Sequence, residues 1–241
     1  MTNEIKLSYA SFRESFPASK AASDPLFSRI VLRPLSLPVA WVLYKVGFSA
    51  NQVTIASIGL ALVASGLLLA GTYTLTIVAA ALFLLVALGD CVDGNVARAR
   101  SDSGPGGEWM DALCGYTVYA LLPLALGLQL ELSGAAALFA GMWVFVGAVT
   151  AISNLHLRVV YQKYVNSMKP EATDGGGNNG KSGLLSRVSG ELGLVGWMMP
   201  ALLLAIVLEA EPLYLFFYCA FYFTAAVIGT VVLARRILRD E

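Results

Sequence analysis

Charged residues are scarce in this chain. Lys, Arg, Asp and Glu together make up 13% of its 241 residues, whereas 57% are hydrophobic. The mean hydropathy is +0.71. A soluble domain typically contains about 25% charged residues. The composition therefore excludes a soluble domain and predicts an integral membrane protein.

Cysteine, histidine and net charge are also low. The chain has three cysteines, one histidine and a formal net charge of zero. An odd number of cysteines, with no pair at metal-ligand spacing, argues against a disulfide framework and against a thiolate metal site. We interpret these cysteines as small buried side chains. Without a net positive charge, we expect no nucleic-acid partner.

The N-terminal region lacks the apolar core of a secretory signal peptide. We expect residues 1–25 to form a polar, partly helical arm, and the chain to insert through its own transmembrane helices. Residues 26–47 alternate apolar patches with three basic residues and two prolines. This pattern favours an amphipathic helix in the membrane interface over a first membrane span.

Six apolar stretches follow, each long enough to cross a membrane. They cover residues 51–71, 75–99, 107–130, 135–160, 190–208 and 213–234. The predicted fold class is an all-α integral membrane protein with six transmembrane helices preceded by an interfacial amphipathic helix. We divide it into 1–48, the arm and interfacial helix, and 49–241, the six-helix transmembrane domain. The Gly-rich run within 168–190 lacks the spacing of a phosphate-binding loop, so we interpret it as a flexible connector.

Basic residues are confined to one side of this arrangement. All 16 Lys and Arg fall in the N-terminal region, the loops after the second and fourth spans, or the C-terminal tail. The connections on the opposite side carry Glu131, Glu209 and Glu211 and no basic residue. The positive-inside rule then makes both termini cytoplasmic. We predict a multi-pass protein of the inner (cytoplasmic) membrane.

One polar stretch, between Gly89 and Gly115, interrupts the apolar pattern. Acidic side chains at bilayer depth usually mark a functional site. On a helix, Asp90 and Asp93 share one face, and Asp111 opens the next helix and can point back at them. Three converging carboxylates, with glycines that let a ligand approach the backbone, suit a hard divalent cation that holds a diphosphate.

Seven residues of this stretch stand at fixed spacing across 22 positions: Asp90-x-x-Asp93-Gly94-x-x-Ala97-Arg98, then eight residues, then Gly107-x-x-x-Asp111. This pattern resembles the signature of the CDP-alcohol phosphotransferase family of integral-membrane enzymes. The resemblance implies transfer of a phosphatidyl, or other phosphoalcohol, group to a hydroxyl acceptor in phospholipid biosynthesis, with release of CMP. It implies CDP-diacylglycerol as the donor and leaves open the reverse usage, in which a CDP-linked small alcohol is joined to diacylglycerol. It also implies a homodimer.

The resemblance also implies roles for individual residues. Catalysis and the binding of one or two Mg2+ or Mn2+ ions fall to Asp90, Asp93 and Asp111. Nucleotide binding falls to Gly94, Ala97, Arg98 and Gly107, and to Asn51 and Thr54, whose other interpretation is simple helix capping. For an anionic acceptor, the cytoplasmic ends of the spans offer Arg158 and Lys163, whose other interpretation is interfacial anchoring.

One position departs from the family pattern. The family has a fourth Asp, four residues after the third, which helps to hold metal and deprotonates the acceptor. This chain has Gly115 there, and Asp102 and Glu108 are the only other acids nearby. Either the acceptor needs no base, or water, His156 or Tyr116 takes the proton, or the protein binds a CDP-lipid without turnover. A non-catalytic binding protein is therefore the alternative function. A transporter is disfavoured, because the acids lie at a helix end and not at the midplane.

Overall fold

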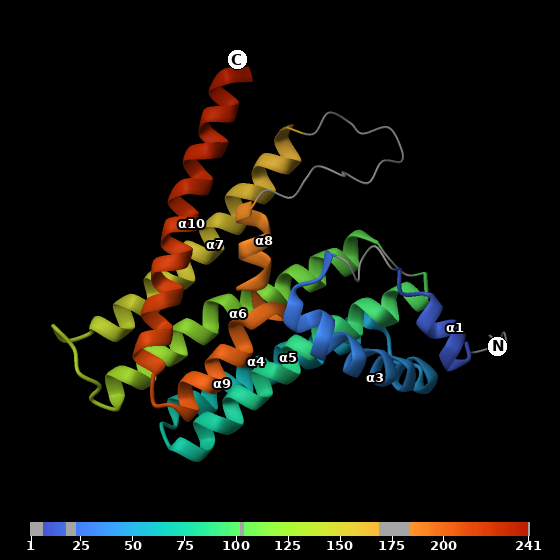
Figure 1. The fold of residues 1–241 in the computed structure, drawn as a ribbon, viewed down its shortest axis with the longest axis horizontal. Helices are drawn as coiled ribbons and strands as arrows, with labels where there is room; N and C mark the ends of the chain where they lie inside the picture. The colour runs from blue at the N-terminus through green and yellow to red at the C-terminus, as the bar shows by residue number, and fades with distance from the viewer. Residues whose placement is uncertain (1–6, 18–22, 102–103, 169–183, 241) are drawn as a thin grey trace.

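The computed structural model describes residues 7–17, 23–101, 104–168 and 184–240. These residues form helices and no strands (Figure 1). Among them are six segments long and apolar enough to cross a membrane. The predicted all-α architecture with six spans is therefore confirmed.

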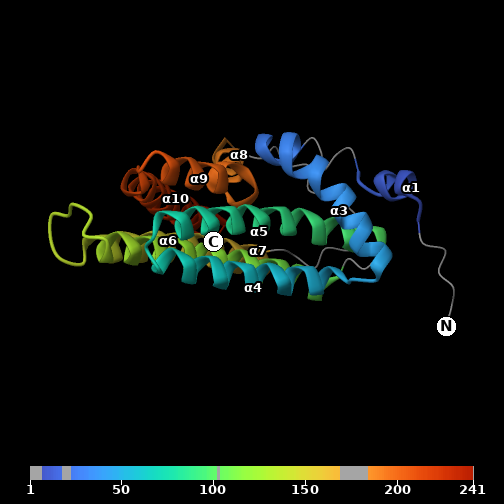
Figure 2. The same cartoon turned by 90° about the horizontal axis from the view of Figure 1, so that it is seen from below.

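Consecutive spans along the chain run in opposite directions (Figure 1). They are α4 (Ala50–Leu69), α5 (Tyr73–Ala99), α6 (Pro105–Leu132), α7 (Met142–Met168), a broken segment ending in α9 (Met199–Val207), and α10 (Glu211–Asp240). Helix α4 contacts α5 and α6, and α7 contacts α6 and α10. Figure 2 shows α4 and α5 side by side. The arrangement brings the start of α4, the end of α5 and the start of α6 to one end of the bundle (Figure 1).

Helices α6 and α7 cross at a pair of glycines. A Cβ atom on Gly127 would collide with the carbonyl oxygen of Trp143, and one on Gly147 with that of Pro123. Small residues of this kind allow transmembrane helices to approach closely. The crossing holds α7 against the helix that carries Asp111.

The described part of the N-terminal region contains helices, as expected, and packs on the bundle. It contains α1 (Tyr9–Glu14) and a π-helix, η1 (Ser28–Leu32), which runs directly into α3 (Arg33–Val46). The continuous helix of η1 and α3 is not among the described segments that are long and apolar enough to cross a membrane. One side of α3 packs on α5 (Figure 2). Its other side exposes an apolar stripe, as is typical of a helix in a membrane interface: Leu35, Val39, Val42 and Val46.

A glycine and a capping serine shape the turn between α3 and α4. Gly47 ends α3 with a φ of 107°, a conformation that favours glycine. Ser49 caps α4: its hydroxyl accepts the backbone N–H of Gln52, and the Gln52 side chain accepts that of Ser49. Asn51 is therefore not the cap, and both it and Thr54 lie in the opening turns of α4.

The fourth span begins later than predicted. Helix α7 starts at Met142, not at 135, because the preceding turn is held by Glu131. The Glu131 carboxylate accepts the backbone N–H groups of Gly141 (2.7 Å) and Trp143 (3.2 Å). A carboxylate at the start of a helix satisfies N–H groups that have no partner within the helix.

The fifth span, predicted over 190–208, is confirmed as Val188–Val207, but its helix is interrupted. The chain there forms α8 (Leu184–Glu191), a break, the π-helix η2 (Leu194–Met198) and then α9. Gly196 has non-helical backbone angles (φ −94°, ψ −136°). The backbone N–H of Leu194 donates to the hydroxyl oxygen of Tyr119 (2.8 Å), which replaces a lost helical bond. Most of the predicted connector 168–190 lies outside the described residues, and its last part is α8.

Candidate active site

A cavity of about 500 Å3 lies where α4, α5 and α6 meet. We call it the first cavity. All three signature carboxylates line it, as do the six residues that the sequence assigns to nucleotide binding. Its lining consists of Arg33, Ala50, Asn51, Thr54, Asp90, Asp93, Gly94, Ala97, Arg98, Gly104, Gly106, Gly107, Glu108 and Asp111.

The helices place these side chains in a simple way. Asp90 and Asp93 are one turn apart near the end of α5. Helix α6 begins with Pro105 after an extended Gly104, and Pro is well suited to the first turn of a helix. Asp111 follows in the second turn of α6 and lines the same cavity. The sequence thus positions acids from two helices at one end of the bundle.

Asp93 is held by α4. Its side chain is 7% exposed, and Oδ2 accepts a hydrogen bond from the Thr54 hydroxyl at 2.7 Å. The same hydroxyl lies 3.1 Å from the backbone oxygen of Ala50. A buried carboxylate needs such partners. Thr54 therefore sets the orientation of Asp93, which is more than the capping role left open from the sequence.

Gly94 leaves room for the Arg98 guanidinium. A Cβ atom on Gly94 would lie 3.3 Å from Arg98 Nη2, which is closer than most such contacts. Arg98 Nη2 donates to Asn95 Oδ1 at 2.7 Å. Among the described residues, the buried Arg98 Nε has no hydrogen-bond partner. A buried donor without a partner is costly. Arg98 also lines the first cavity, so its guanidinium is placed to attract an anion there.

A second cavity, of about 540 Å3, adjoins the first. The two share four lining residues: Arg33, Asp90, Glu108 and Asp111. The rest of the lining comes from α6, α7, the break before η2 and the N-terminal region: Ser23, Asp24, Pro25, Ala112, Gly115, Tyr116, Tyr119, Arg158, Gln162, Ser189, Gly190, Gly193, Leu194 and Val195. The acids of α5 and α6 thus lie between two compartments.

Gly115 lines the second cavity, and packing does not require a glycine there. A Cβ atom on Gly115 would meet only the Tyr119 ring, at an ordinary contact distance of 3.9 Å. The site therefore has open space where the family's fourth Asp would place its carboxylate.

Of the two residues predicted to bind an anionic acceptor, the structure brings one to the site. The Arg158 guanidinium lies 4.0 Å from the centroid of the Tyr119 ring, and its Nε donates to Asn154 Oδ1 at 2.8 Å. Stacking on an aromatic face positions a guanidinium. Lys163 is exposed and is not among the residues that line either cavity.

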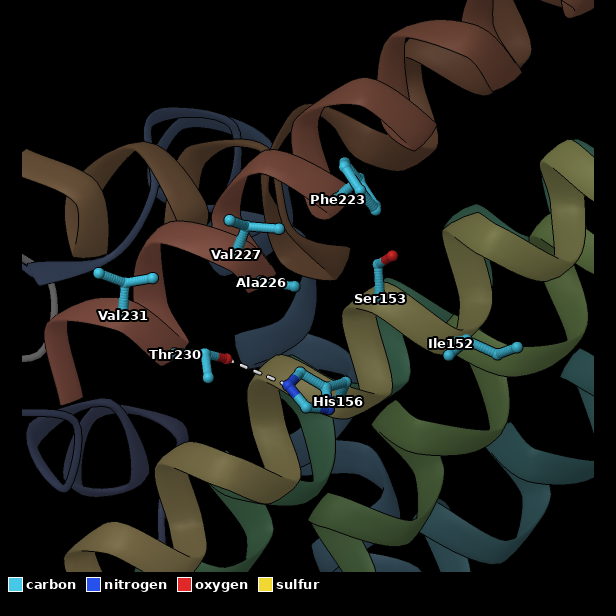
Figure 3. Close-up of a pocket in the computed structure, with 8 residues that line it drawn as sticks. All are labelled: Ile152, Ser153, His156, Phe223, Ala226, Val227, Thr230 and Val231. Carbon is cyan, nitrogen blue, oxygen red and sulfur yellow. Dashed lines mark hydrogen bonds between the residues drawn. The ribbon is translucent and has the colours of Figure 1, made fainter. Parts of the chain in front are cut away.

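His156 lies elsewhere. It lines an apolar groove of about 360 Å3 between α7 and α10 (Figure 3). His156 Nε2 and Thr230 Oγ1 are 3.1 Å apart. Since His156 is absent from the lining of both acidic cavities, the structure does not support it as a base. Tyr116 lines the second cavity, and Asp102 lies outside the described residues.

Sequence reasoning missed three residues of the site: Asp24, Arg33 and Asn95. Arg33 lines both cavities, and Asn95 holds Arg98. Arg33 is one of the three basic residues in the segment 26–47, and no local pattern indicates that this segment reaches the acids. Asn95 follows the signature Gly94 directly. The signal in the sequence was a polar amide next to the acidic motif in an apolar span.

The donor set fits a hard divalent cation. Carboxylate oxygens are the ligands that Mg2+ and Mn2+ prefer, and three carboxylates line the first cavity. As they stand, no three His, Cys, Asp or Glu side chains of the described residues are close enough to form a ready metal site. Metal binding here requires the carboxylates to draw together.

Comparison with known proteins agrees with the geometry. A family model described as CDP-alcohol phosphatidyltransferase matches residues 48–208, which is more than half of the chain. The match spans α4 to α9, and it begins after α3. Among curated proteins, no match was found.

Proposed function

This chain belongs to the CDP-alcohol phosphatidyltransferase family, and we propose that it moves a phosphatidyl group from CDP-diacylglycerol to a hydroxyl acceptor. Membership of the family implies the general reaction, which is the transfer of a phosphoalcohol from a CDP-alcohol in phospholipid synthesis. One observation supports transfer to a second bound substrate, whereas the choice of CDP-diacylglycerol rests on the family resemblance. Two cavities meet at Asp90, Glu108 and Asp111, as a reaction between two bound substrates requires.

The donor occupies the first cavity. Gly94, Ala97 and Gly107 line it with little side-chain bulk, so the nucleotide can lie against the helix backbone. Arg98 lines this cavity, and a charge-assisted hydrogen bond from its guanidinium to the diphosphate is stronger than a neutral one. Asn51, in the first turn of α4, offers its amide to the nucleotide.

Asp90, Asp93 and Asp111 would hold one or two Mg2+ or Mn2+ ions, which would neutralise charge on the diphosphate. Neighbouring residues orient and bury one of these ligands, Asp93. Thr54 fixes Asp93 through the 2.7 Å hydrogen bond to Oδ2. Burial of Asp93 among α4 and α5 excludes water from one side of the carboxylate.

The acceptor occupies the second cavity. Arg158 supplies positive charge there, which favours an acceptor that carries a phosphate or carboxylate. The acceptor hydroxyl oxygen attacks the phosphorus that carries the diacylglycerol. The bond between that phosphorus and the bridging oxygen breaks, and CMP leaves with the bridging oxygen. In-line placement of nucleophile and leaving group is the main demand of such a transfer.

The hydroxyl proton goes to Glu108 in this proposal. Glu108 lines both cavities and is the shared carboxylate that we do not assign to metal. It can serve in place of the family's fourth Asp, which is Gly115 here. A positioned general base contributes a factor of roughly 10²–10⁴ to the rate.

We further propose that both termini and both cavities face the cytoplasm, because all 16 Lys and Arg belong to that side of the predicted topology. A homodimer in the inner membrane, with 49–241 as the catalytic domain, completes the proposal.

The test is CMP release by the purified chain in detergent, with CDP-diacylglycerol, Mg2+ or Mn2+, and a pool of alcohols that includes glycerol phosphate, inositol phosphate and serine. We expect CMP release that depends on the acceptor and is lost in Asp93→Ala. CMP release without any acceptor dependence would contradict the transferase assignment.

The open space at Gly115 favours a second candidate, a CDP-lipid-binding protein without turnover. It predicts metal-dependent binding of CDP-diacylglycerol with no CMP release from any acceptor. Gly115→Asp would then be the variant to assay, since the structure has room for the added carboxylate.

A further inference from the structure

Arg33 is the residue of the N-terminal region that lines both cavities. It begins α3, and it lies outside the range matched by the family model. Its side chain is 11% exposed and forms an ion pair with the buried Asp24. Arg33 Nε donates to Asp24 Oδ2 at 2.6 Å, and Nη2 donates to Oδ1 at 3.2 Å. This two-point contact fixes the plane of the guanidinium.

The outer nitrogen of Arg33 points at α5. Nη1 lies 3.4 Å from the backbone oxygen of Cys91 and 3.4 Å from Asn95 Oδ1. Both distances exceed the usual range for a hydrogen bond from nitrogen to oxygen. Nη1 is therefore held weakly, in contrast to the two nitrogens that face Asp24. A substrate oxygen could take over this donor at little cost.

Asn95 links Arg33 to Arg98. Its Oδ1 accepts from Arg98 Nη2 at 2.7 Å, and its Nδ2 donates to the Ser36 hydroxyl at 3.0 Å. Asn95 is 2% exposed. The Phe16 ring lies beside both guanidinium groups, with centroid distances of 4.9 Å to Arg33 and 5.4 Å to Arg98. Two like charges thus converge on one amide and one ring.

Such a pair is unfavourable unless an anion separates or bridges the charges. Asp24 compensates Arg33 from the side away from α5. Burial acts to lower the pKa of Arg33, but the hydrogen bond with Asp24 and the nearby acids raise it overall. Arg33 therefore remains charged at any physiological pH.

We propose that Arg33 binds the phosphate that is transferred, at the junction of the two cavities. The proposal rests on the proposed function, and it adds a substrate-binding residue from outside the signature. The phosphate attached to cytidine stays in the first cavity, whereas the transferred phosphate must face both substrates. Arg33 lines both compartments together with Asp90, Glu108 and Asp111, so it is placed to meet that group.

The alternative is that Arg33 only anchors α3 to α5. The two roles differ in which ligands they affect. CDP-diacylglycerol contains the transferred phosphate, and CMP does not. An anchoring role predicts equal effects on both ligands, because loss of α3 packing would disturb the whole cavity.

The experiment compares Arg33→Met and Arg33→Lys with Arg100→Met in the full chain. Arg100 is an exposed arginine at the end of α5 that lines neither cavity, so it controls for loss of charge. The dissociation constants of short-chain CDP-diacylglycerol and of CMP are measured with Mg2+ present. Thermal unfolding midpoints verify that each variant is folded.

We expect Arg33→Met to weaken CDP-diacylglycerol binding by about tenfold or more, and CMP binding by less than about threefold. Arg33→Lys should retain part of the binding, and Arg100→Met all of it. Equal losses for both ligands, or no loss for either, would overturn the proposal.

A second variant protects the test against misfolding. Asp24→Asn keeps the Arg33 charge but removes the ion pair that orients it, and we expect the same selectivity for CDP-diacylglycerol at smaller size. If the wild-type chain binds neither ligand, the proposed function fails together with this inference. If it binds and turns over CDP-diacylglycerol while Arg33→Met is unimpaired, only this inference fails.

Discussion

Two sides of α7 face very different surroundings, and the difference separates a candidate site from an apolar groove. Arg158 lies over the Tyr119 ring beside a cavity lined by acids, arginines and backbone. His156, two residues earlier, lines an apolar groove and has one polar contact, with Thr230 (Figure 3). Polar side chains that converge from several elements indicate chemistry, whereas an isolated and satisfied histidine does not.

The largest effect should come from the acids themselves. We expect Asp93→Ala to lower kcat/KM for CDP-diacylglycerol by at least about 10³-fold, because it removes a proposed metal ligand and its hydrogen bond with the Thr54 hydroxyl. Initial rates of CMP release measure this. A loss below about tenfold would mean that Asp93 is a structural residue.

Glu108→Gln should follow. We expect a fall in kcat of about 10²-fold with little change in the dissociation constant of CDP-diacylglycerol, since the change removes the proposed base and keeps the shape. In the double variant Glu108→Gln with Gly115→Asp, the family's own carboxylate should restore part of the rate. An unchanged kcat in Glu108→Gln would contradict Glu108 as the base and would favour water or Tyr116 as the proton acceptor.

Thr54→Val should have an intermediate effect. The isosteric change removes the hydrogen bond to Asp93, which is worth about 1.5–3 kcal/mol when the acceptor is charged. We expect the Mg2+ concentration for half-maximal activity to rise by roughly 10-fold or more. Thr54→Ser, which keeps the hydroxyl, is the matched control and should behave like the wild type.

The smallest effect should come from the groove between α7 and α10. We expect His156→Ala to change kcat/KM by less than about twofold, and to destabilise the protein by about 1 kcal/mol or less through loss of the contact with Thr230. Activity and the thermal unfolding midpoint measure the two parts. A loss of activity as large as that of Glu108→Gln would erase the distinction between the two regions.

Local patterns in the sequence predicted most of the site. Asp90, Asp93 and Asp111 were expected on two neighbouring helix ends, and they line one cavity with Asn51 and Thr54. The Gly47 stop and the Ser49 cap were equally visible. These features follow from helix periodicity and capping, which act over a few residues.

Tertiary features were not predictable in this way. The break before η2 depends on Tyr119, which accepts the N–H of Leu194 from 75 positions away, although the repeated glycines of that segment were a signal. The approach of Arg33 to Asn95 depends on how α3 packs against α5. No spacing within a single helix encodes such contacts.

The most direct test of the central claim is product stoichiometry. The wild-type chain and Asp93→Ala are incubated with CDP-diacylglycerol, Mg2+ and the acceptor that supports CMP release, and lipid products are identified by mass spectrometry. We predict one phosphatidyl-acceptor lipid for each CMP released by the wild type, and neither product from Asp93→Ala. CMP accompanied by phosphatidic acid in place of that lipid would contradict the account, because it would show hydrolysis and not transfer.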